Sequence, residues 1–336
     1  MKIVKCQLLL ALLNLVSIAV VGQDPSFTQY FSSPLTLNPA NSGNFNGPMR
    51  LATNYRNQWQ GIGDPYVTGT ISFESEILRD KMGKGNRLAV GVLGLFDRNI
   101  GGGFNSNYLS ASVGYHLLLN GEETDKISIG FQTAYVNKKL DNTILSYANQ
   151  FTSGGFDLSL PSNEPNTSGI VNYLDFNTGV TYTHKNDKGG FYLGAALFHI
   201  LSPSESFYSS TSNRLPMRVN LHAGATINTG EYDRLHFTGL FMKQGGINQS
   251  TLGFLYEKNI PSDINDMAIT FGGFARFKDA VIPYIGTKYN DIQIGISYDV
   301  TNSSLNIGQT RNRSIELSLI YNFPDKSAQR RYTPWY

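Results

Sequence analysis

Apolar and polar residues alternate with a period of two along much of the chain. In the stretch 291–300 the apolar positions are Ile292, Ile294, Ile296, Tyr298 and Val300. Successive side chains of an extended strand point to opposite faces, so this stretch has one apolar face and one polar face. The same alternation recurs at 127–135, 174–182 and 315–323. The pattern predicts a protein built from β-strands, each with one apolar face.

Fourteen such strands are expected along the chain. They lie near residues 48–58, 65–76, 87–97, 105–118, 126–138, 171–184, 190–200, 215–228, 234–243, 249–258, 267–277, 280–289, 291–301 and 313–323. Strands of about ten residues match the tilted span of a bilayer, and bacterial single-chain barrels have an even strand number. The sequence therefore predicts an all-β fold, a 14-stranded antiparallel transmembrane β-barrel whose wall is formed by residues 48–323.

The connections between the expected strands differ in length. The two longest, Leu140–Ile170 and Leu201–Arg214, fall at the same end of the barrel as Asn302–Asn312. Outer-membrane barrels have long extracellular loops and short periplasmic turns. We therefore expect these loops to be extracellular and both termini to be periplasmic, including a polar C-terminal tail at 324–336.

The first 22 residues resemble a secretory signal. Lys2 and Lys5 precede an apolar run, Leu8–Val21, which small residues follow. A membrane anchor is the alternative, but the run is shorter than the roughly twenty residues that a spanning helix needs. No uninterrupted apolar stretch of eighteen residues follows, which excludes further spanning helices. A cleavable signal leaves two classes for the mature chain, a soluble β protein or an outer-membrane barrel.

Charge and cysteine content limit the classes of function that the chain can have. Only 15% of residues are charged, against about 25% in a typical soluble domain. Removal of residues 1–22 takes away Lys2, Lys5 and the only cysteine, Cys6, so 25 basic residues remain against 25 acidic ones. Disulfides and cysteine catalysis are then excluded, and the balanced charge argues against a nucleic-acid partner.

Catalytic, cofactor and metal signals are weak. The five histidines, His116, His184, His199, His222 and His236, fall on different expected strands without a close pair. The chain contains neither a Gly-x-Ser-x-Gly elbow nor a His-Glu-x-x-His motif. We expect no enzyme activity, cofactor or metal, although a serine and a histidine brought together in space would make a barrel deacylase possible.

Residues 23–47 form a separate N-terminal segment. Asp24 and Pro25 are expected to begin a short helix with an aromatic face, which Pro34 ends, and Asn38-Pro39 to cap a second turn. The segment can pack on the barrel as a simple terminal extension, fill the lumen as a plug, or contact a periplasmic partner. Because the inward positions of the strands are mostly small and polar, the sequence leaves open whether the lumen is a pore or is plugged.

The sequence of residues 24–59 resembles the N-terminal sequence signature of a known family. The matching residues are Asp24-Pro25-Ser26-Phe27-Thr28-Gln29-Tyr30, Pro34-Leu35, Leu37-Asn38-Pro39-Ala40, Gly43 and Tyr55-Arg56-Asn57-Gln58-Trp59. In this order they are similar to the start of PorP/SprF proteins. The resemblance implies a non-enzymatic 14-stranded outer-membrane barrel of the type IX secretion and gliding machinery, which serves export or surface attachment of large adhesins. The pair Asn41-Ser42 departs from the family pattern before the glycine.

Seven residues are the candidates for partner binding: Arg56, Asn57, Gln58, Trp59, Phe27, Tyr30 and Phe31. The first four close the first strand at its outer end, where an exposed Trp needs a purpose. In the alternative interpretation Trp59 is an interfacial anchor and Arg56 pairs with a lumen carboxylate such as Glu74 or Glu76. The partners expected are a large secreted adhesin or type IX substrate, periplasmic and outer-membrane components of the machinery, and outer-membrane lipid.

Barrel architecture by itself supports a second function equally well. A diffusion channel or solute transporter would have the same strand pattern, because a fold does not decide a function. Conductance of the pure protein in a bilayer, set against co-purification of a large secreted protein, separates the two functions.

Overall fold

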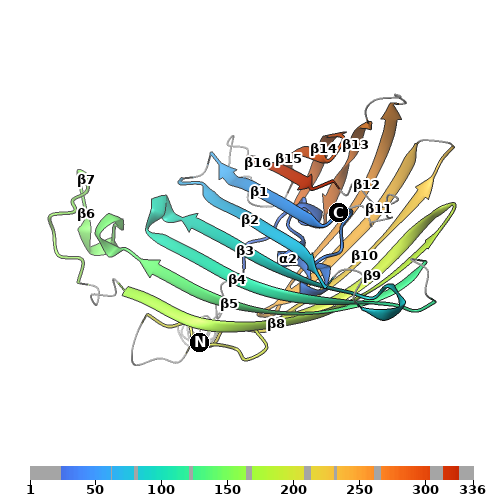
Figure 1. Cartoon of the computed structure of the whole chain (residues 1–336). Helices are drawn as coiled ribbons and strands as arrows, with labels where there is room; N and C mark the ends of the chain where they lie inside the picture. Colours follow the sequence, from blue (N-terminus) through green and yellow to red (C-terminus); the bar gives the residue numbers. More distant parts are fainter. Residues whose placement is uncertain are drawn as a thin grey trace, which may run out of the picture.

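The computed structural model describes residues 24–61, 63–78, 82–120, 124–163, 169–207, 213–230, 233–260, 266–302 and 313–324. Fourteen strands close into one antiparallel barrel, which confirms the predicted fold (Figure 1). Their bounds are β1 Met49–Gln60, β2 Tyr66–Ile77, β3 Arg87–Asn99, β4 Phe104–Leu118, β5 Asp125–Leu140, β8 Gly169–Asn186, β9 Gly189–Phe198, β10 Arg218–Asn228, β11 Arg234–Gln244, β12 Ile247–Ile260, β13 Met267–Arg276, β14 Ala280–Tyr289, β15 Ile292–Thr301 and β16 Arg313–Asn322.

The barrel closes between its first and last strands. β1 pairs with β16 in a continuous register from Arg50↔Asn322 to Asn57↔Ile315. The register then shifts before the pair Gln60↔Arg313, and Trp59, which lies in the shift, has a φ of 63°. Such a bulge bends a strand and ends its regular pairing. We call the β1–β16 contact the seam.

The two ends of the barrel differ in the length of their connections. The three longest, residues 141–168, 199–217 and 302–312, lie at the end where β1 finishes, which we call the long-loop end. The other end, where β1 begins and β16 finishes, is the short-turn end. The long connection between β5 and β8 carries a hairpin that the strand pattern did not predict, β6 Phe151–Thr152 with β7 Gly155–Phe156, and it projects well beyond the wall (Figure 1).

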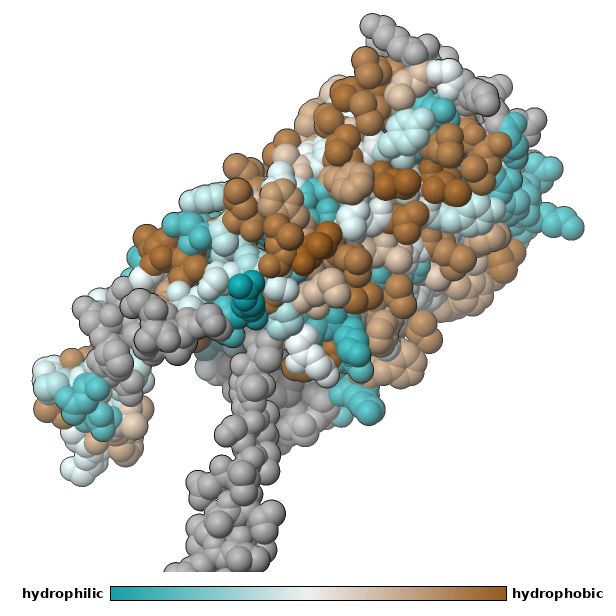
Figure 2. Space-filling model, turned by 90° about the horizontal axis from the view of Figure 1, so that it is seen from below, coloured by the Kyte–Doolittle hydropathy of each residue, from teal (hydrophilic) through white to brown (hydrophobic). Residues whose placement is uncertain are grey.

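Alternation gives the wall two unlike faces. In β15, Ile292, Ile294 and Ile296 are 41–43% exposed on the outside, whereas Ser297 and Asp299 are buried inside. Apolar side chains cover much of the outer wall in the face that Figure 2 shows. An apolar exterior with a polar interior is the pattern of barrels that sit in lipid. No helix among the described residues is long and apolar enough to cross a membrane.

Residues 24–47 run through the inside of the barrel, and we call them the lumen segment. Every residue from Phe27 to Phe45 is buried except Thr36. The segment contains three short helical turns, η1 Tyr30–Ser32, α2 Pro34–Leu37 and η2 Pro39–Asn41. The brief turns outside it are η3 Gly83–Gly85, η4 Ile100–Gly102, η5 Asn142–Ile144 and η6 Ala148–Gln150.

The predicted helix in the lumen segment was misplaced. Residues 24–29 are not helical, and Pro34 begins α2 where we expected it to end a helix. Proline suits the first helical position, because its missing N–H has no helical acceptor there and its φ is already helical. The second turn follows its prediction, since the Asn38 side chain accepts the N–H of Ala40 and caps η2.

The lumen segment connects the two ends of the barrel. Asp24 lies at the long-loop end, where its N–H donates to Gln244 at the end of β11. Gly47 lies against Phe323 at the short-turn end, where β16 finishes. The mature N-terminus at residue 23 and the tail at 324–336, for which we predicted a periplasmic location, lie outside the described residues apart from Pro324, as does the signal at 1–22. The first described residue, Asp24, lies at the long-loop end, which we expected to be extracellular.

Candidate functional site

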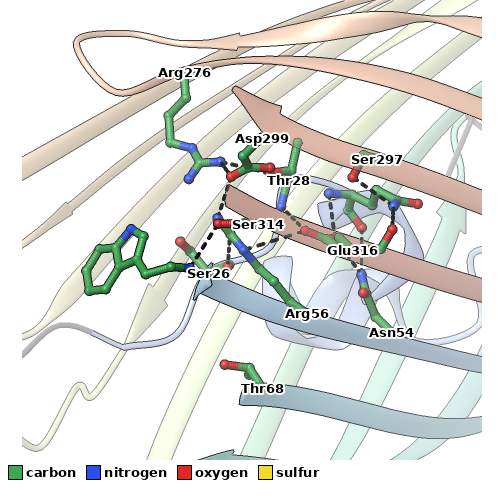
Figure 3. Close-up of polar contacts among 12 residues, drawn as sticks. Ser26, Thr28, Asn54, Arg56, Thr68, Arg276, Ser297, Asp299, Ser314 and Glu316 are labelled. Carbon is green, nitrogen blue, oxygen red and sulfur yellow. Dashed lines mark hydrogen bonds and ion pairs between the residues drawn. The ribbon is translucent and has the colours of Figure 1, made fainter. Parts of the chain in front are cut away.

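The carboxylate of Glu316 fixes the lumen segment to the seam. Glu316, an inward residue of β16, is fully buried. It accepts the backbone N–H groups of Thr28 and Gln29 at 2.9 and 2.8 Å, and the Asn54 amide on β1 at 2.9 Å (Figure 3). A carboxylate accepts up to four hydrogen bonds, and charged acceptors form the stronger ones. One side chain therefore joins the first strand, the last strand and the lumen segment.

Two arginines complete this network. Arg56 on β1 donates to the Ser26 carbonyl at 2.6 Å and to Asp299 on β15 at 2.8 Å. Arg276 on β13 bonds the same Asp299 oxygen at 2.5 Å and the Thr28 hydroxyl at 3.0 Å (Figure 3). Both guanidinium groups are almost fully buried, and a buried charge is tolerated only when it is paired and hydrogen-bonded. We call Arg56, Arg276, Asp299 and Glu316 the seam network.

A second charged cluster holds the first described residue at the long-loop end. The Asp24 carboxylate contacts His199 Nε2 at 2.5 Å and Arg218 at 2.9 Å, while His199 Nδ1 contacts Asp175 at 2.9 Å. His199 follows the last residue of β9, and Arg218 begins β10. We call Asp24, Asp175, His199 and Arg218 the mouth cluster.

The mouth cluster shifts the protonation of its members. Burial lowers the pKa of His199, but the negative charge of Asp24 and hydrogen bonds to Asp175 and Asp24 outweigh burial and raise that pKa to about 9. Burial raises the pKa of Asp24, but the charges of His199 and Arg218 dominate and hold it well below the ordinary value. At neutral pH the Asp24 carboxylate therefore lies between two cations, His199 just after β9 and Arg218 at the start of β10.

Wall glycines make room for the middle of the lumen segment. A Cβ on Gly130 would lie 2.2 Å from the backbone of Pro39 and Ala40, and a Cβ on Gly179 would lie 2.0 Å from the Asn38 side chain. The Asn38 amide in turn donates to the carbonyls of Val180 and Ala195 at 3.2 and 3.1 Å, which are wall backbone groups. The turn η2 therefore seats directly on the inner wall, which only glycine permits.

Aromatic packing supports the same segment from the opposite wall. The Phe31 ring stacks on Phe274 at 6.1 Å and meets Tyr284 edge-on at 5.8 Å. The Tyr30 hydroxyl is 2.5 Å from the Thr238 hydroxyl. Phe31 is 1% exposed and Tyr30 is 3% exposed. Phe31 belongs to an apolar cluster that includes residues of β13 and β14, and Tyr30 belongs to a second cluster that includes Leu240 on β11.

The short-turn end is closed by a further ion pair. Arg50 on β1 donates to both oxygens of Glu74 on β2 at 2.9 and 3.0 Å, and Glu74 accepts the N–H of Gly43 at 3.2 Å. The Arg50 guanidinium lies over the Phe45 ring at 4.8 Å. The last turn of the lumen segment is therefore held by the same kind of contact as its beginning.

The structure separates the seven candidate residues into two groups. Arg56, Phe27, Tyr30 and Phe31 are at most 5% exposed and contact the protein's own interior. Arg56 does pair with a lumen carboxylate, but the carboxylate is Asp299, whereas Glu74 pairs with Arg50. Asn57, Gln58 and Trp59 are only half-buried, and the Trp59 ring meets Tyr66 edge-on at 4.8 Å.

Sequence reasoning missed most of the groups that hold the lumen segment. They are Glu316, Asp299, Arg276, His199, Asp24 and Arg218. A usable signal was present in the sequence. Arg276 and Asp299 are the only charged residues of β13 and β15, and Glu316 is the only charged residue on the inward face of β16. Within the described residues, no group of three His, Cys, Asp or Glu side chains has the geometry to hold a metal ion.

One family of known proteins matches most of the chain. The family described as "Type IX secretion system membrane protein PorP/SprF" matches residues 19–321 of the chain. No curated protein matches the chain significantly.

Three solved structures are similar in fold. The CymD monoaromatic hydrocarbon channel is 12% identical, with 90% of this chain and 96% of that chain covered and a TM-score of 0.48. The Ralstonia pickettii toluene transporter TbuX is 10% identical, with 92% and 98% covered and a TM-score of 0.47. The Pseudomonas putida toluene transporter TodX is 10% identical, with 87% and 93% covered and a TM-score of 0.49. We draw no functional conclusion from likeness at this level.

Proposed function

The chain belongs to the PorP/SprF family of type IX secretion system membrane proteins, and we propose that it is a non-enzymatic outer-membrane docking barrel. In this role it helps to export a large secreted adhesin or to attach it to the cell surface. Its residues 1–22 direct export and are removed, its long-loop end faces the cell surface, and its short-turn end faces periplasmic components of the machinery.

The filled lumen is the observation that carries this proposal. From Phe27 to Phe45 all residues but Thr36 are buried, and the seam network, the mouth cluster and the Arg50–Glu74 pair fix the segment along its length. A diffusion channel requires a continuous aqueous path, whereas a scaffold needs a rigid wall. A plugged barrel with an intact wall supports docking by its surfaces over conduction through its interior.

The docking surface that we propose lies at the long-loop end of β1. Asn57, Gln58 and Trp59 are accessible there, beside the bulge in the seam. Aromatic residues are frequent anchors of protein interfaces, and the half-buried Trp59 is oriented by its contact with Tyr66. Arg56, Phe27, Tyr30 and Phe31 serve this surface indirectly, because they hold the lumen segment behind it.

Recovery of the secreted partner together with the barrel tests the docking surface. We expect Trp59→Ala to leave the barrel folded in the outer membrane and to reduce co-purification of the large secreted partner at least fivefold. Tyr289→Ala is the matched control, since Tyr289 is also an exposed aromatic but lies at the short-turn end. Unchanged partner recovery with Trp59→Ala, or an equal loss with Tyr289→Ala, would contradict the assignment of this surface.

Planar-bilayer recording tests the closed lumen. The pure wild-type protein should show no steady conductance, whereas a barrel without residues 24–47 should conduct if it folds. Steady conductance of the wild-type protein would favour the channel over the docking barrel.

A further inference from the structure

The outer wall near the long-loop end carries polar side chains in an ordered arrangement. Across β3, β4, β5 and β8, residues that face outward fall into three successive rows by strand register. The lowest row is apolar and the middle row contains three asparagines. The uppermost row contains two basic residues. Polar groups on a lipid-facing wall cost free energy that falls toward the interface, so such an arrangement marks a level near the head groups.

The middle row is a line of amides. Asn107 pairs in register with Asn137, which pairs with Asn172. The Asn137 amide donates to the Asn172 oxygen at 2.8 Å, while Asn107 and Asn172 are exposed. The row below it is Gly94, Leu109, Tyr135 and Leu174, of which the last three are 50–61% exposed. Apolar and amide rows therefore adjoin on the same outer face.

The uppermost row is Arg98, Asn105, Lys139 and Ile170, of which two are basic. Arg98 pairs in register with Asn105, and Asn105 with Lys139. Arg98 is exposed and its guanidinium lies 5.7 Å from the Phe96 ring. The Lys139 side chain is 52% exposed and is 3.4 Å from Asp141, a loose and mostly solvent-screened pair. Two exposed cations therefore lie one row above the amides.

A groove of about 370 Å³ opens beside these rows on β1–β4. Its lining includes Tyr55, Gly69, Ile71, Gly94 and Phe96, and no residue of the lumen segment. Tyr55, Ile71 and Phe96 are 37–58% exposed, so the groove lies on the outer face of the wall. A Cβ on Gly94 would approach Ile71 no closer than 3.5 Å, so the groove floor is open at Gly94, whereas the Phe96 ring covers Gly69.

We propose that this face binds one phosphorylated, acylated glycolipid of the outer leaflet. An acyl chain fits the groove. The amide row binds carbonyl and hydroxyl groups of the sugar and of its ester or amide links. A phosphate binds Arg98 and Lys139. Successive outward residues of a strand are about 7 Å apart, so the three rows cover about 14 Å from chain to phosphate. Basic clusters at the membrane edge are known to recognise lipid head groups.

The charge pattern selects this occupant over an uncharged lipid. Arg98 and Lys139 complement a phosphate, whereas the amides alone would accept any ester. The site rests on the proposed function in one respect, because the long-loop end must face the outer leaflet, where phosphorylated glycolipids reside. That orientation is tested separately, by labelling a cysteine at Ser159, which follows β7 in the connection between β5 and β8, on intact cells.

Native mass spectrometry tests the lipid site in the full barrel. The protein is released from nanodiscs that contain lipid A and phosphatidylglycerol in equal amounts. The wild-type barrel should retain one lipid A with at least tenfold preference over phosphatidylglycerol. The double variant Arg98→Gln with Lys139→Gln should lose this preference at least fivefold. The control, Arg234→Gln with Lys258→Gln, removes two exposed basic residues at the short-turn end and should retain it.

A second variant tests the groove. Gly94→Leu fills the floor without touching the basic row, and we expect it to reduce lipid A retention while the barrel stays folded. Inorganic phosphate at millimolar concentration should displace little lipid, because it lacks the acyl chain. Equal retention by wild type and double variant, no preference over phosphatidylglycerol, or complete displacement by phosphate would each overturn the proposal. Failure of surface labelling at Ser159 with retained lipid A would instead contradict the orientation in the proposed function.

Discussion

The Glu316 carboxylate accepts the backbone N–H of Gln29 at 2.8 Å, across 287 positions of sequence. The contact joins the last strand of the wall to a segment that precedes the first strand. Because Glu316 also accepts the Asn54 amide on β1, one side chain contributes both to closure of the barrel and to seating of the lumen segment.

Glu316→Gln should weaken both the closure of the barrel and the seating of the lumen segment. One carboxylate oxygen becomes an NH₂ group, which leaves the Thr28 or Gln29 N–H without an acceptor and removes a negative charge from beside Arg56. We expect the barrel to lose about 3 kcal/mol of stability. The measurement is the temperature at which the folded band disappears on a semi-native gel. Asp157→Asn, on the exposed connection between β5 and β8, is the control and should change nothing.

Phe31→Ala should loosen the lumen segment from the inside. Phe31 loses its contacts with Phe274 and Tyr284, and a large-to-small change in a packed core costs about 3–5 kcal/mol. The same melting assay should show the loss, together with transient openings in bilayer recordings. Phe156→Ala is the matched control because Phe156 is 56% exposed. Equal behaviour of the two variants would contradict a packed lumen core.

Gly130→Ala should obstruct the seat of η2. The added Cβ would lie 2.2 Å from backbone atoms of Pro39 and Ala40, so the segment has to move away from the wall. Overpacking costs typically about 1–3 kcal/mol. Gly83→Ala introduces the same methyl where no atom lies within 4 Å, and it should leave the melting temperature unchanged. A wild-type melting temperature for Gly130→Ala would mean that the turn does not sit against β5.

Stability should fall in alkaline solution through His199. Because the pKa of His199 is raised from 6.5 to about 9, the stabilisation is complete below pH 6.5 and is lost as the pH rises through 9. The shift corresponds to about 3 kcal/mol. The lowered pKa of Asp24 acts oppositely, since its contribution is present above its ordinary value of 3.8 and is lost in strong acid. Melting temperatures between pH 6 and 10 should decline in wild type.

His199→Gln should remove most of that decline, because glutamine cannot carry the charge. An unchanged slope in the variant would assign the alkaline loss to another group. His184→Gln is the control, since His184 lies at the short-turn end beside Asp125 and has no contact with the mouth cluster.

The wall of the barrel could be predicted from the sequence because alternation is a local signal. Each strand carries its own pattern, and all fourteen strands lie near their expected positions. The main deviation is β10, which starts at Arg218 and not at residue 215. Pro216 has no N–H for a strand ladder, which explains the later start.

The interior could not be predicted in the same way, because its contacts join residues far apart in sequence. Asp24 meets His199 and Arg218, and Arg56 meets Asp299, at separations that no local pattern encodes. The sequence of residues 23–47 is equally compatible with a loop, a terminal extension or a plug in the lumen. Only in the closed barrel do inward charged side chains of the wall come within hydrogen-bond distance of the backbone of this segment.

The place of Glu316 on the strand that is made last sets a constraint on biogenesis. A chain that lacks residues 313–322 contains the groups that Glu316 binds but not Glu316 itself. In such a chain the lumen segment, the stopper of the barrel, has lost this anchor. Sealing of the cylinder and fastening of the stopper thus depend on the same strand. A chain truncated before residue 313 would lack the closing strand and the hydrogen bonds to Thr28 and Gln29 together, so an open wall and an unfastened stopper would arise from the same defect.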